Sequence, residues 1–149
     1  MPLVKIVYAS MTGNTEGISE ILEDQFSELD MEVERVEADD ADEDFFDDAD
    51  ICVIATYTYD EGELPFDLED FYEDLPEQDL SGKVYGVVGS GDSELYPDYF
   101  CDSAVDFDNA FAETGATKGH EVVKIENDAD DEDEVVLKEF VKALVEAYG

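Results

Sequence analysis

The sequence predicts a doubly wound three-layer α/β domain with a five-stranded parallel sheet between two layers of helices. Four short apolar runs, rich in β-branched residues, are typical of strands buried on both faces; they span residues 3–9, 51–55, 84–89 and 122–125. Stretches with the 3.6-residue period of amphipathic helices lie between them. Strands that alternate with helices imply right-handed crossovers, and hence a parallel sheet covered on both sides.

The remaining elements follow from their periodicity. Residues 31–38 alternate apolar and charged side chains, which predicts the fifth strand and places it nearer a sheet edge. Four helices are expected from apolar stripes. Those stripes are Ile18, Ile21, Leu22, Phe26 and Leu29; Leu68, Phe71, Tyr72 and Leu75; Phe100, Ala104, Phe107 and Phe111; and Leu137, Phe140, Val141, Leu144, Val145 and Tyr148.

Length and composition favour a single soluble domain. The 149 residues are 44% hydrophobic, enough for one continuous core, so one domain over residues 1–149 is expected. No apolar run approaches the ~18 residues of a membrane span, and the first residues resemble no secretory signal, which predicts a cytoplasmic protein. Cys52 and Cys101 fall in different predicted elements, so we expect two reduced thiols and no metal cluster.

The net charge of −37 restricts the partners. Phosphate backbones and anionic membranes would be repelled, which argues against nucleic acid and membrane binding and favours basic proteins. An acidic surface adapted to salt accounts for the charge equally well, and the sequence leaves both explanations open.

The segment after the first predicted strand has the composition of a phosphate-binding loop. It supplies hydroxyl, amide and glycine residues directly before a helix, whose first N–H groups have no partners within the helix. Its residues are Ser10, Met11, Thr12, Gly13, Asn14 and Thr15. The absence of lysine and arginine excludes a Walker A loop, and the pattern is not a dinucleotide-binding turn. An ordinary polar turn with a helix cap is the alternative.

The segments after the third and fourth strands are rich in tyrosine and glycine. Ligands of such sheets bind beyond the carboxyl ends of the strands, and a planar ring needs apolar faces together with hydrogen-bonding backbone at its edge. The candidate residues are Thr56, Tyr57, Thr58, Tyr59, Asp60, Glu61 and Gly62, and Ser90, Gly91, Asp92, Tyr96, Tyr99, Phe100 and Cys101. For Tyr57, a half-buried packing role is equally compatible.

The pattern Ser-x-Thr-Gly-Asn-Thr at residues 10–15, directly after a first strand, resembles the FMN-phosphate loop of flavodoxins. Chain length and element order match that family over essentially the whole sequence. The resemblance implies strand order 2-1-3-4-5 and non-covalently bound FMN. It also implies a monomeric, low-potential one-electron carrier that cycles between semiquinone and hydroquinone. Its partners would be basic-surfaced redox proteins, such as a flavodoxin reductase, and it would have no substrate-converting site.

Within this resemblance, Tyr59 matches the residue that covers the inner flavin face and Tyr96 the outer one, with Tyr99 as the competing outer residue. Asp92 and the backbone around it would meet the pyrimidine edge. Asp60 departs from the family, which often has glycine there, where the peptide turns over on reduction. Aspartate pays roughly 1 kcal/mol at positive φ, so Asp60 should weaken semiquinone stabilisation unless Gly62 takes over the turn.

The acidity acquires a role in this hypothesis, because negative charge near reduced, anionic FMN raises its free energy and lowers the potential. The expected local contributors are Asp60, Glu61, Asp92 and Glu94.

Two other classes of protein share part of this sequence pattern. A phospho-accepting receiver domain has the same architecture, but it needs acidic residues after strand one and an aspartate at the end of strand three, where this chain has Ser10 and Thr56. A divalent-cation loop over residues 128–139 would place Asp133 where an EF-hand requires glycine, within a segment that predicts a core helix. His120, Lys5 and Lys83 assemble with no nucleophile in the loops.

Overall fold

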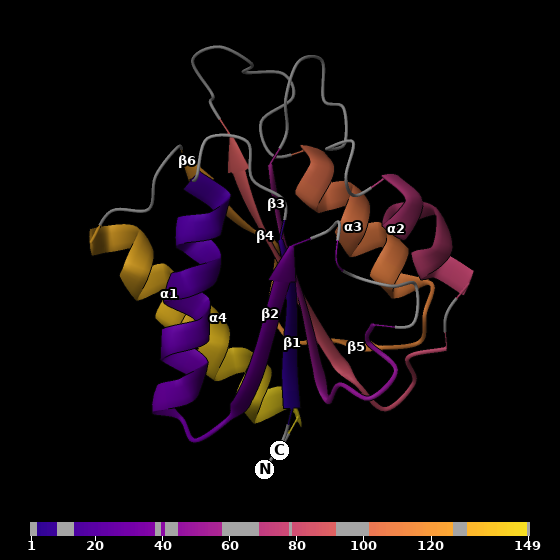
Figure 1. Cartoon of the computed structure of the whole chain (residues 1–149), viewed down its shortest axis with the longest axis horizontal. Coiled ribbons are helices and arrows are strands. Elements are labelled where there is room, and N and C mark those ends of the chain that lie inside the picture. Colours follow the sequence, from indigo (N-terminus) through magenta and orange to yellow (C-terminus); the bar gives the residue numbers. More distant parts are fainter. Residues whose placement is uncertain are drawn as a thin grey trace.

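The fold is a single parallel sheet between two layers of helices. The computed structural model describes residues 3–8, 14–37, 40, 45–57, 69–77, 79–91, 102–126 and 131–148. Figure 1 shows α1 (Asn14–Glu28) and α4 (Asp131–Tyr148) on one face of the sheet, and α2 (Glu69–Asp74) and α3 (Asp102–Ala112) on the other. A 3-10 turn, η3 (Leu75–Glu77), continues α2. The doubly wound three-layer class predicted from sequence is confirmed.

The strand order is β2-β1-β3-β4, with the fifth position beside β4. The strands are β1 (Leu3–Tyr8), β2 (Glu32–Glu37), β3 (Ile51–Tyr57), β4 (Val84–Gly91), β5 (Thr117–Lys118) and β6 (Val123–Glu126). Each pair is parallel. β2 lies at the edge, as its alternating pattern predicts, and the order 2-1-3-4-5 is confirmed.

The fifth strand position differs from the prediction because two short strands share it. β5 pairs with the start of β4, at Val84↔Thr117, and β6 pairs with its end, at Val88↔Val123. Between these two pairs β4 advances by four residues, from Val84 to Val88, whereas the segment beside it advances by six, from Thr117 to Val123. The two extra residues interrupt the fifth strand. A Cβ at Gly119 would clash with the side chains of Leu144 and Val84, so the backbone at residue 119 lies closer to these two side chains than any residue other than glycine permits.

Side chains of each inner strand alternate between the two faces and build two cores. Val4 and Ile6 of β1 pack with α1 and α4, whereas Val7 belongs to the core under α2 and α3. The first core also holds Ile18, Leu22, Phe26, Leu137, Phe140, Val141 and Leu144. The second core also holds Phe46, Phe71, Leu75, Leu80, Ala104, Phe107 and Phe111.

The predicted apolar stripes match these cores except near two helix ends. Leu29 is 38% exposed and follows the last residue of α1, and Tyr148 is 39% exposed at the last residue of α4. Both were predicted on buried faces, and both predictions are wrong because the sheet no longer covers the helix there. Leu68 and Phe100 lie outside the described residues.

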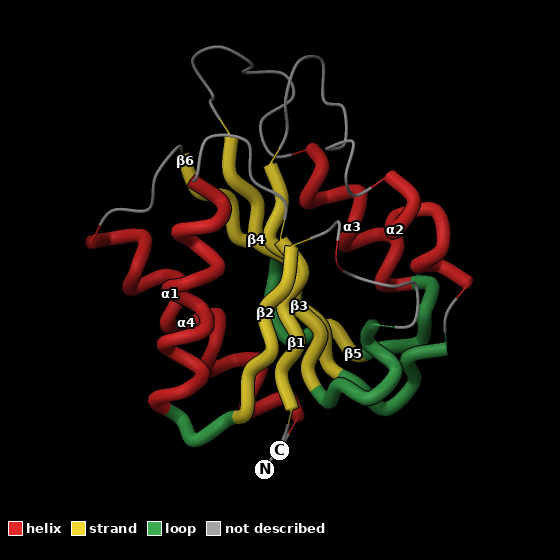
Figure 2. The backbone as a smooth tube through the Cα atoms, viewed as in Figure 1, coloured by secondary structure: helices red, strands yellow, loops and turns green. Residues whose placement is uncertain are grey.

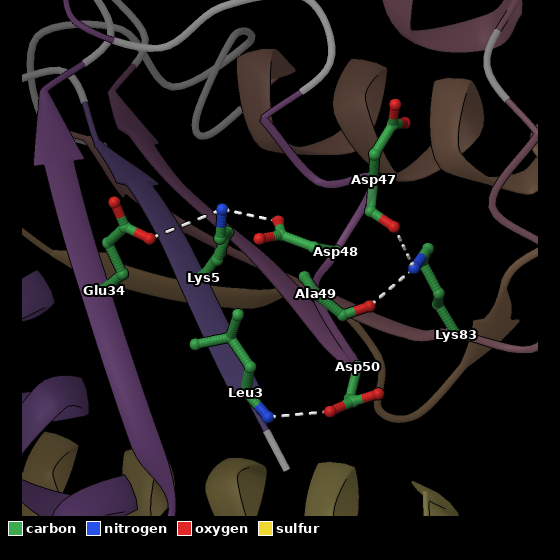
Figure 3. Close-up of polar contacts among 8 residues, drawn as sticks. All are labelled: Leu3, Lys5, Glu34, Asp47, Asp48, Ala49, Asp50 and Lys83. Carbon is green, nitrogen blue, oxygen red and sulfur yellow. Dashed lines mark hydrogen bonds and ion pairs between the residues drawn. The ribbon is translucent and has the colours of Figure 1, made fainter.

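Two lysines fasten the connection between β2 and β3, as Figure 3 shows. Lys83 Nζ donates to the carbonyl oxygens of Asp47 and Ala49, at 2.8 and 2.6 Å. Lys5, only 7% exposed within β1, pairs with Asp48 at 2.6 Å and with Glu34 at 3.4 Å. These contacts give both lysines a structural role.

Close packing of α4 on the sheet yields the first prediction. A Cβ at Gly86 would lie 2.5 Å from Phe140 Cζ and 3.0 Å from Leu144 Cδ1, so Gly86→Ala should lower the free energy of unfolding by about 1–3 kcal/mol. Gly17→Ala is the matched control: apart from its own helix, no atom of the described residues lies within 4 Å of that Cβ, and alanine in the helix should stabilise by roughly 0.5–1 kcal/mol. Urea unfolding of wild type and the two variants, each without bound ligand, measures both effects. Equal stability of Gly86→Ala and wild type would contradict the packing described here.

Candidate functional site

The carboxyl edge of the sheet contains the point at which strand order reverses. β2 lies on one side of β1 in the sheet and β3 on the other side. β1 and β3 are therefore neighbours, and the connections that follow them lead to opposite edges of the sheet. Figure 2 shows the strands running side by side, and the arrowheads in Figure 1, drawn in the same view, place their carboxyl ends toward the top. Ligands of doubly wound sheets bind at such a position.

α1 begins close behind the first strand, two residues earlier than the sequence predicts, because Asn14 and Thr15 of the expected loop are already helical. Its first residue is Asn14, six positions after the last residue of β1, Tyr8. The first N–H groups of a helix have no partner within it, and the helix dipole adds positive potential, so this helix start can bind an anion. The backbone of Asn14 and Thr15 is helical, whereas Ser10, Met11, Thr12 and Gly13 lie outside the described residues.

The third and fourth strands extend further into the candidate site than predicted. Thr56 and Tyr57 complete β3, and Ser90 and Gly91 complete β4, with Tyr57 paired opposite Ser90. These four residues were predicted to belong to loops, and that assignment is wrong because the strand pairing continues through them. Thr56 is fully buried.

The other candidate residues fall beyond these strand ends. Thr58, Tyr59, Asp60, Glu61 and Gly62, and Asp92, Tyr96, Tyr99, Phe100 and Cys101, lie outside the described residues. Their roles, and the choice between Tyr96 and Tyr99, stay predictions.

A charged cluster that sequence reasoning missed lies beside the start of α1. Arg35 of β2 stacks over the ring of Tyr8, with its Cζ 5.1 Å from the ring centroid, and Nη1 donates to Ser19 Oγ at 3.1 Å. Ser19 Oγ donates in turn to the Glu16 carbonyl at 2.7 Å. The signal in the sequence was that Arg35 is the only arginine of the chain.

Carboxylates surround this cluster. Tyr8 Oη donates to Glu37 Oε1 at 3.4 Å, and Arg35 pairs with Glu23 at 3.5 Å and Glu20 at 3.9 Å. Burial raises the pKa of Tyr8 above its ordinary value, the charges of Glu37 and Glu16 raise it further, and Arg35 opposes them. The phenol is therefore neutral at physiological pH.

The two alternative functions fail against this geometry. Residues 131–148 form one continuous helix, so no calcium loop can run from residue 128 to residue 139. At the end of β3, Ala55 and Thr56 occupy the position where a receiver domain needs an aspartate. Among the described residues, no group of three or more histidine, cysteine, aspartate or glutamate side chains could hold a metal ion.

His120, like the two lysines, has a local partner. Its Nδ1 lies 2.7 Å from the Glu121 carbonyl oxygen, and its ring packs edge-on against Phe140 at 5.4 Å between centroids. The position is far along the chain from the carboxyl ends of β1 and β3.

Cys52 is excluded as a redox group by its burial. It is fully buried within β3 as a free thiol, and desolvation raises its pKa to about 12. The thiolate is the reactive form, so this sulfur is inert at neutral pH. Cys101 lies outside the described residues.

The second prediction concerns this thiol. Iodoacetamide at pH 8 should leave Cys52 unmodified in the folded protein and alkylate it in urea, as peptide mass spectrometry would show for each cysteine separately. The unfolded chain ionises the thiol near its ordinary pKa, whereas the folded chain keeps the proton up to about pH 12, so this group lowers stability as pH rises between those values. Alkylation at the same rate with and without urea would contradict its burial.

The described part of this edge fits FMN. A helix start at the switch point can bind a terminal phosphate without a basic residue, and the adjoining ends of β3 and β4 offer backbone groups to a ring edge. Fold and site together define a class: doubly wound α/β proteins that hold a phosphorylated planar cofactor at the carboxyl edge of the sheet.

Comparison with known proteins narrows this class. The family model for flavodoxin matches residues 6–139. A probable flavodoxin 2 of Bacillus subtilis is 36% identical over 150 residues, covering 100% of this chain and 98% of that protein.

Solved structures agree. A short-chain flavodoxin associated with a non-canonical PDU bacterial microcompartment is 44% identical, with a TM-score of 0.97 over 100% of both chains. The flavodoxin of Streptococcus pneumoniae TIGR4 is 49% identical, with a TM-score of 0.93 over 97% of this chain and 99% of that one.

The chain belongs to the flavodoxin family. It is an electron-transfer protein that uses FMN, with redox proteins as its partners, and it converts no substrate of its own. Within the described residues, none of the helices has the length and apolar character needed to cross a membrane.

Proposed function

We propose that this chain is a single-domain, monomeric, cytoplasmic carrier that passes one electron at a time at low potential. Its FMN is held without a covalent bond between three segments, residues 10–15, 56–62 and 90–101. One observation supports the proposal: α1 begins at Asn14, close behind β1 at its pairing with β3, and the free N–H groups of a helix start can bind an anion such as a phosphate.

Each segment has a distinct task in this proposal. The N–H groups at the start of α1 and the hydroxyl groups of residues 10–15 hold the phosphate. Tyr59 and Tyr96 cover the two ring faces, with Tyr99 as the alternative to Tyr96, and both exclude water from the ring. The backbone near Asp92 binds the pyrimidine edge. FMN itself supplies the one-electron chemistry, and the chain fixes its position and electrostatic surroundings.

Negative charge accounts for the low potential. The chain carries 44 acidic residues against seven basic ones. Each added negative charge near the ring disfavours uptake of an electron, and about 1.4 kcal/mol corresponds to ~59 mV for one electron. Asp60, Glu61, Asp92 and Glu94 are the proposed local contributors.

The same charge selects partners with basic surfaces, such as a flavodoxin reductase or another electron donor or acceptor. Glu20 and Asp24 of α1 are exposed, as is much of the first turn of α4 at Asp131 and Glu132. Fixed charges of one sign steer an oppositely charged partner and speed its approach, and salt screens that attraction. Adaptation to a salty interior remains a second origin of the charge.

The third prediction tests the carrier function directly. The purified protein, supplied with FMN if isolated without it, should show oxidised-flavin absorption bands, and stepwise dithionite titration should resolve two one-electron reductions. The same titration of free FMN is the control, because free flavin does not separate the two steps. A protein that stays colourless after incubation with FMN would overturn the proposed function and leave the fold intact.

The fourth prediction concerns Asp60, which lies outside the described residues. If the peptide after the inner tyrosine turns over on reduction, Asp60→Gly removes a steric cost of roughly 1 kcal/mol and should widen the gap between the two one-electron potentials by several tens of millivolts. Asp60→Asn is the matched control, because it removes the charge without adding glycine's freedom. It should raise the potentials with a smaller change in their separation. An unchanged gap in Asp60→Gly would show that another residue, such as Gly62, makes the turn.

A further inference from the structure

Arg35 contacts the residues on both sides of the proposed phosphate loop. Tyr8 ends β1, two positions before the first residue of that loop, and Ser19 lies in the second turn of α1, the helix that begins at Asn14. The guanidinium group is 5.1 Å from the Tyr8 ring centroid and donates to Ser19 Oγ at 3.1 Å. The side chain of Arg35 is 18% exposed, so it lies mostly between β2 and α1.

Four carboxylates lie around this one cation. Glu20 and Glu23 pair with Arg35 directly, and Glu37 accepts from the Tyr8 hydroxyl. Glu16 lies in the first turn of α1, close enough to Tyr8 to act on that phenol. Glu16, Glu20 and Glu23 all belong to the helix whose start would bind the phosphate. Their negative charges reduce the positive potential that the helix dipole creates at that start.

No basic residue of the loop itself offsets these charges, because residues 9–15 contain neither lysine nor arginine. The other six cations of the chain are lysines at positions 5, 83, 118, 124, 138 and 142. Lys5 and Lys83 are engaged on the other face of the sheet, in the connection between β2 and β3. Arg35, by contrast, contacts α1 directly, through Ser19 and Glu23.

We propose that Arg35 is a positioning residue for binding of the FMN phosphate. It joins the two flanks of the loop, Tyr8 and Ser19, and offsets the glutamates that would otherwise repel a dianion at the start of α1. Its action is indirect, through the loop flanks and the local potential. This inference rests on the proposed function, since it takes FMN as the ligand and residues 10–15 as its phosphate loop.

A purely structural role for Arg35 makes a different prediction. Loss of an ion pair that only supports folding would weaken every flavin alike, because ring and phosphate contacts would loosen together. Loss of the charge balance would weaken binding of FMN and leave binding of riboflavin unchanged, because riboflavin has the same ring and no phosphate. The ratio of the two dissociation constants therefore separates the two roles.

The fifth prediction measures that ratio by quenching of flavin fluorescence as flavin-free full-length protein is added. In Arg35→Gln, the dissociation constant for FMN should rise about tenfold at low ionic strength while that for riboflavin changes less than about threefold. In roughly 0.5 M NaCl the difference should shrink, because the screening length falls to about 4 Å. Arg35→Lys should keep most of the preference for FMN, since it retains the charge.

Lys118→Gln is the matched control. Lys118 also pairs with two carboxylates, Asp108 at 3.0 Å and Glu121 at 3.1 Å, and its loss changes the net charge by the same unit. It lies in β5, which pairs with the start of β4 and so at the opposite edge of the sheet from the carboxyl ends. Its ratio of FMN to riboflavin binding should equal that of wild type.

Glu16→Gln tests the idea without touching Arg35. Removing this exposed carboxylate should tighten the binding of FMN at low salt and leave the binding of riboflavin unchanged. This variant tests the inference even if Arg35→Gln fails to fold. A parallel loss of both flavins in Arg35→Gln, an equal effect in Lys118→Gln, or an unchanged ratio in Glu16→Gln would overturn the proposed role. Wild-type protein that binds neither flavin would instead refute the proposed function, and the role of Arg35 with it.

Discussion

Burial of both faces of the parallel sheet is the interaction on which the rest of this structure depends. A chain with a net charge of −37 repels itself in any compact state, so apolar burial has to exceed that repulsion. Strands β1, β3 and β4 supply it by sending alternate residues into two separate cores, with Phe26 and Phe140 on one side and Phe107 and Phe111 on the other. Because helices must cover both faces, the crossovers divide at β1 and β3, and this division creates the edge that we propose for cofactor binding.

Four of the seven cations of the chain lie where separate elements of the fold meet. Lys5 joins β1 to β2 and to the connection that precedes β3, and Lys83 holds the same connection from the other side. Arg35 joins β2 to α1 and to the end of β1, and Lys118 joins β5 to α3. Each of these cations neutralises nearby acidic groups on a surface that is otherwise acidic. Their ion pairs and hydrogen bonds therefore stabilise particular junctions, while the molecule as a whole remains strongly negative.

This division of roles suits an electron carrier. The described core contains an inert thiol, Cys52, and side chains that pack, so nothing in it competes with the flavin for electrons. The strand ends at Tyr57 and Gly91 extend the sheet toward the proposed cofactor site, which would give the proposed binding segments a fixed support. The chemistry belongs to FMN, and the protein controls its position, its exposure to water and the charge around it.

The sequence by itself determined the fold class, the edge position of β2 and the presence of a helix close behind β1, because these follow from local periodicity and from the composition of one short segment. It also indicated the family, through residues 10–15. Tertiary structure decided what depends on contacts between distant residues. Strand pairing extended β3 through Thr56 and Tyr57, and two extra residues opposite β4 interrupted the fifth strand. The sheet's extent left Leu29 and Tyr148 exposed, although each continues an apolar stripe. The cluster around Arg35 joins residues 8, 19 and 35, whose proximity no local pattern encodes, since it exists only once β1, α1 and β2 have packed together.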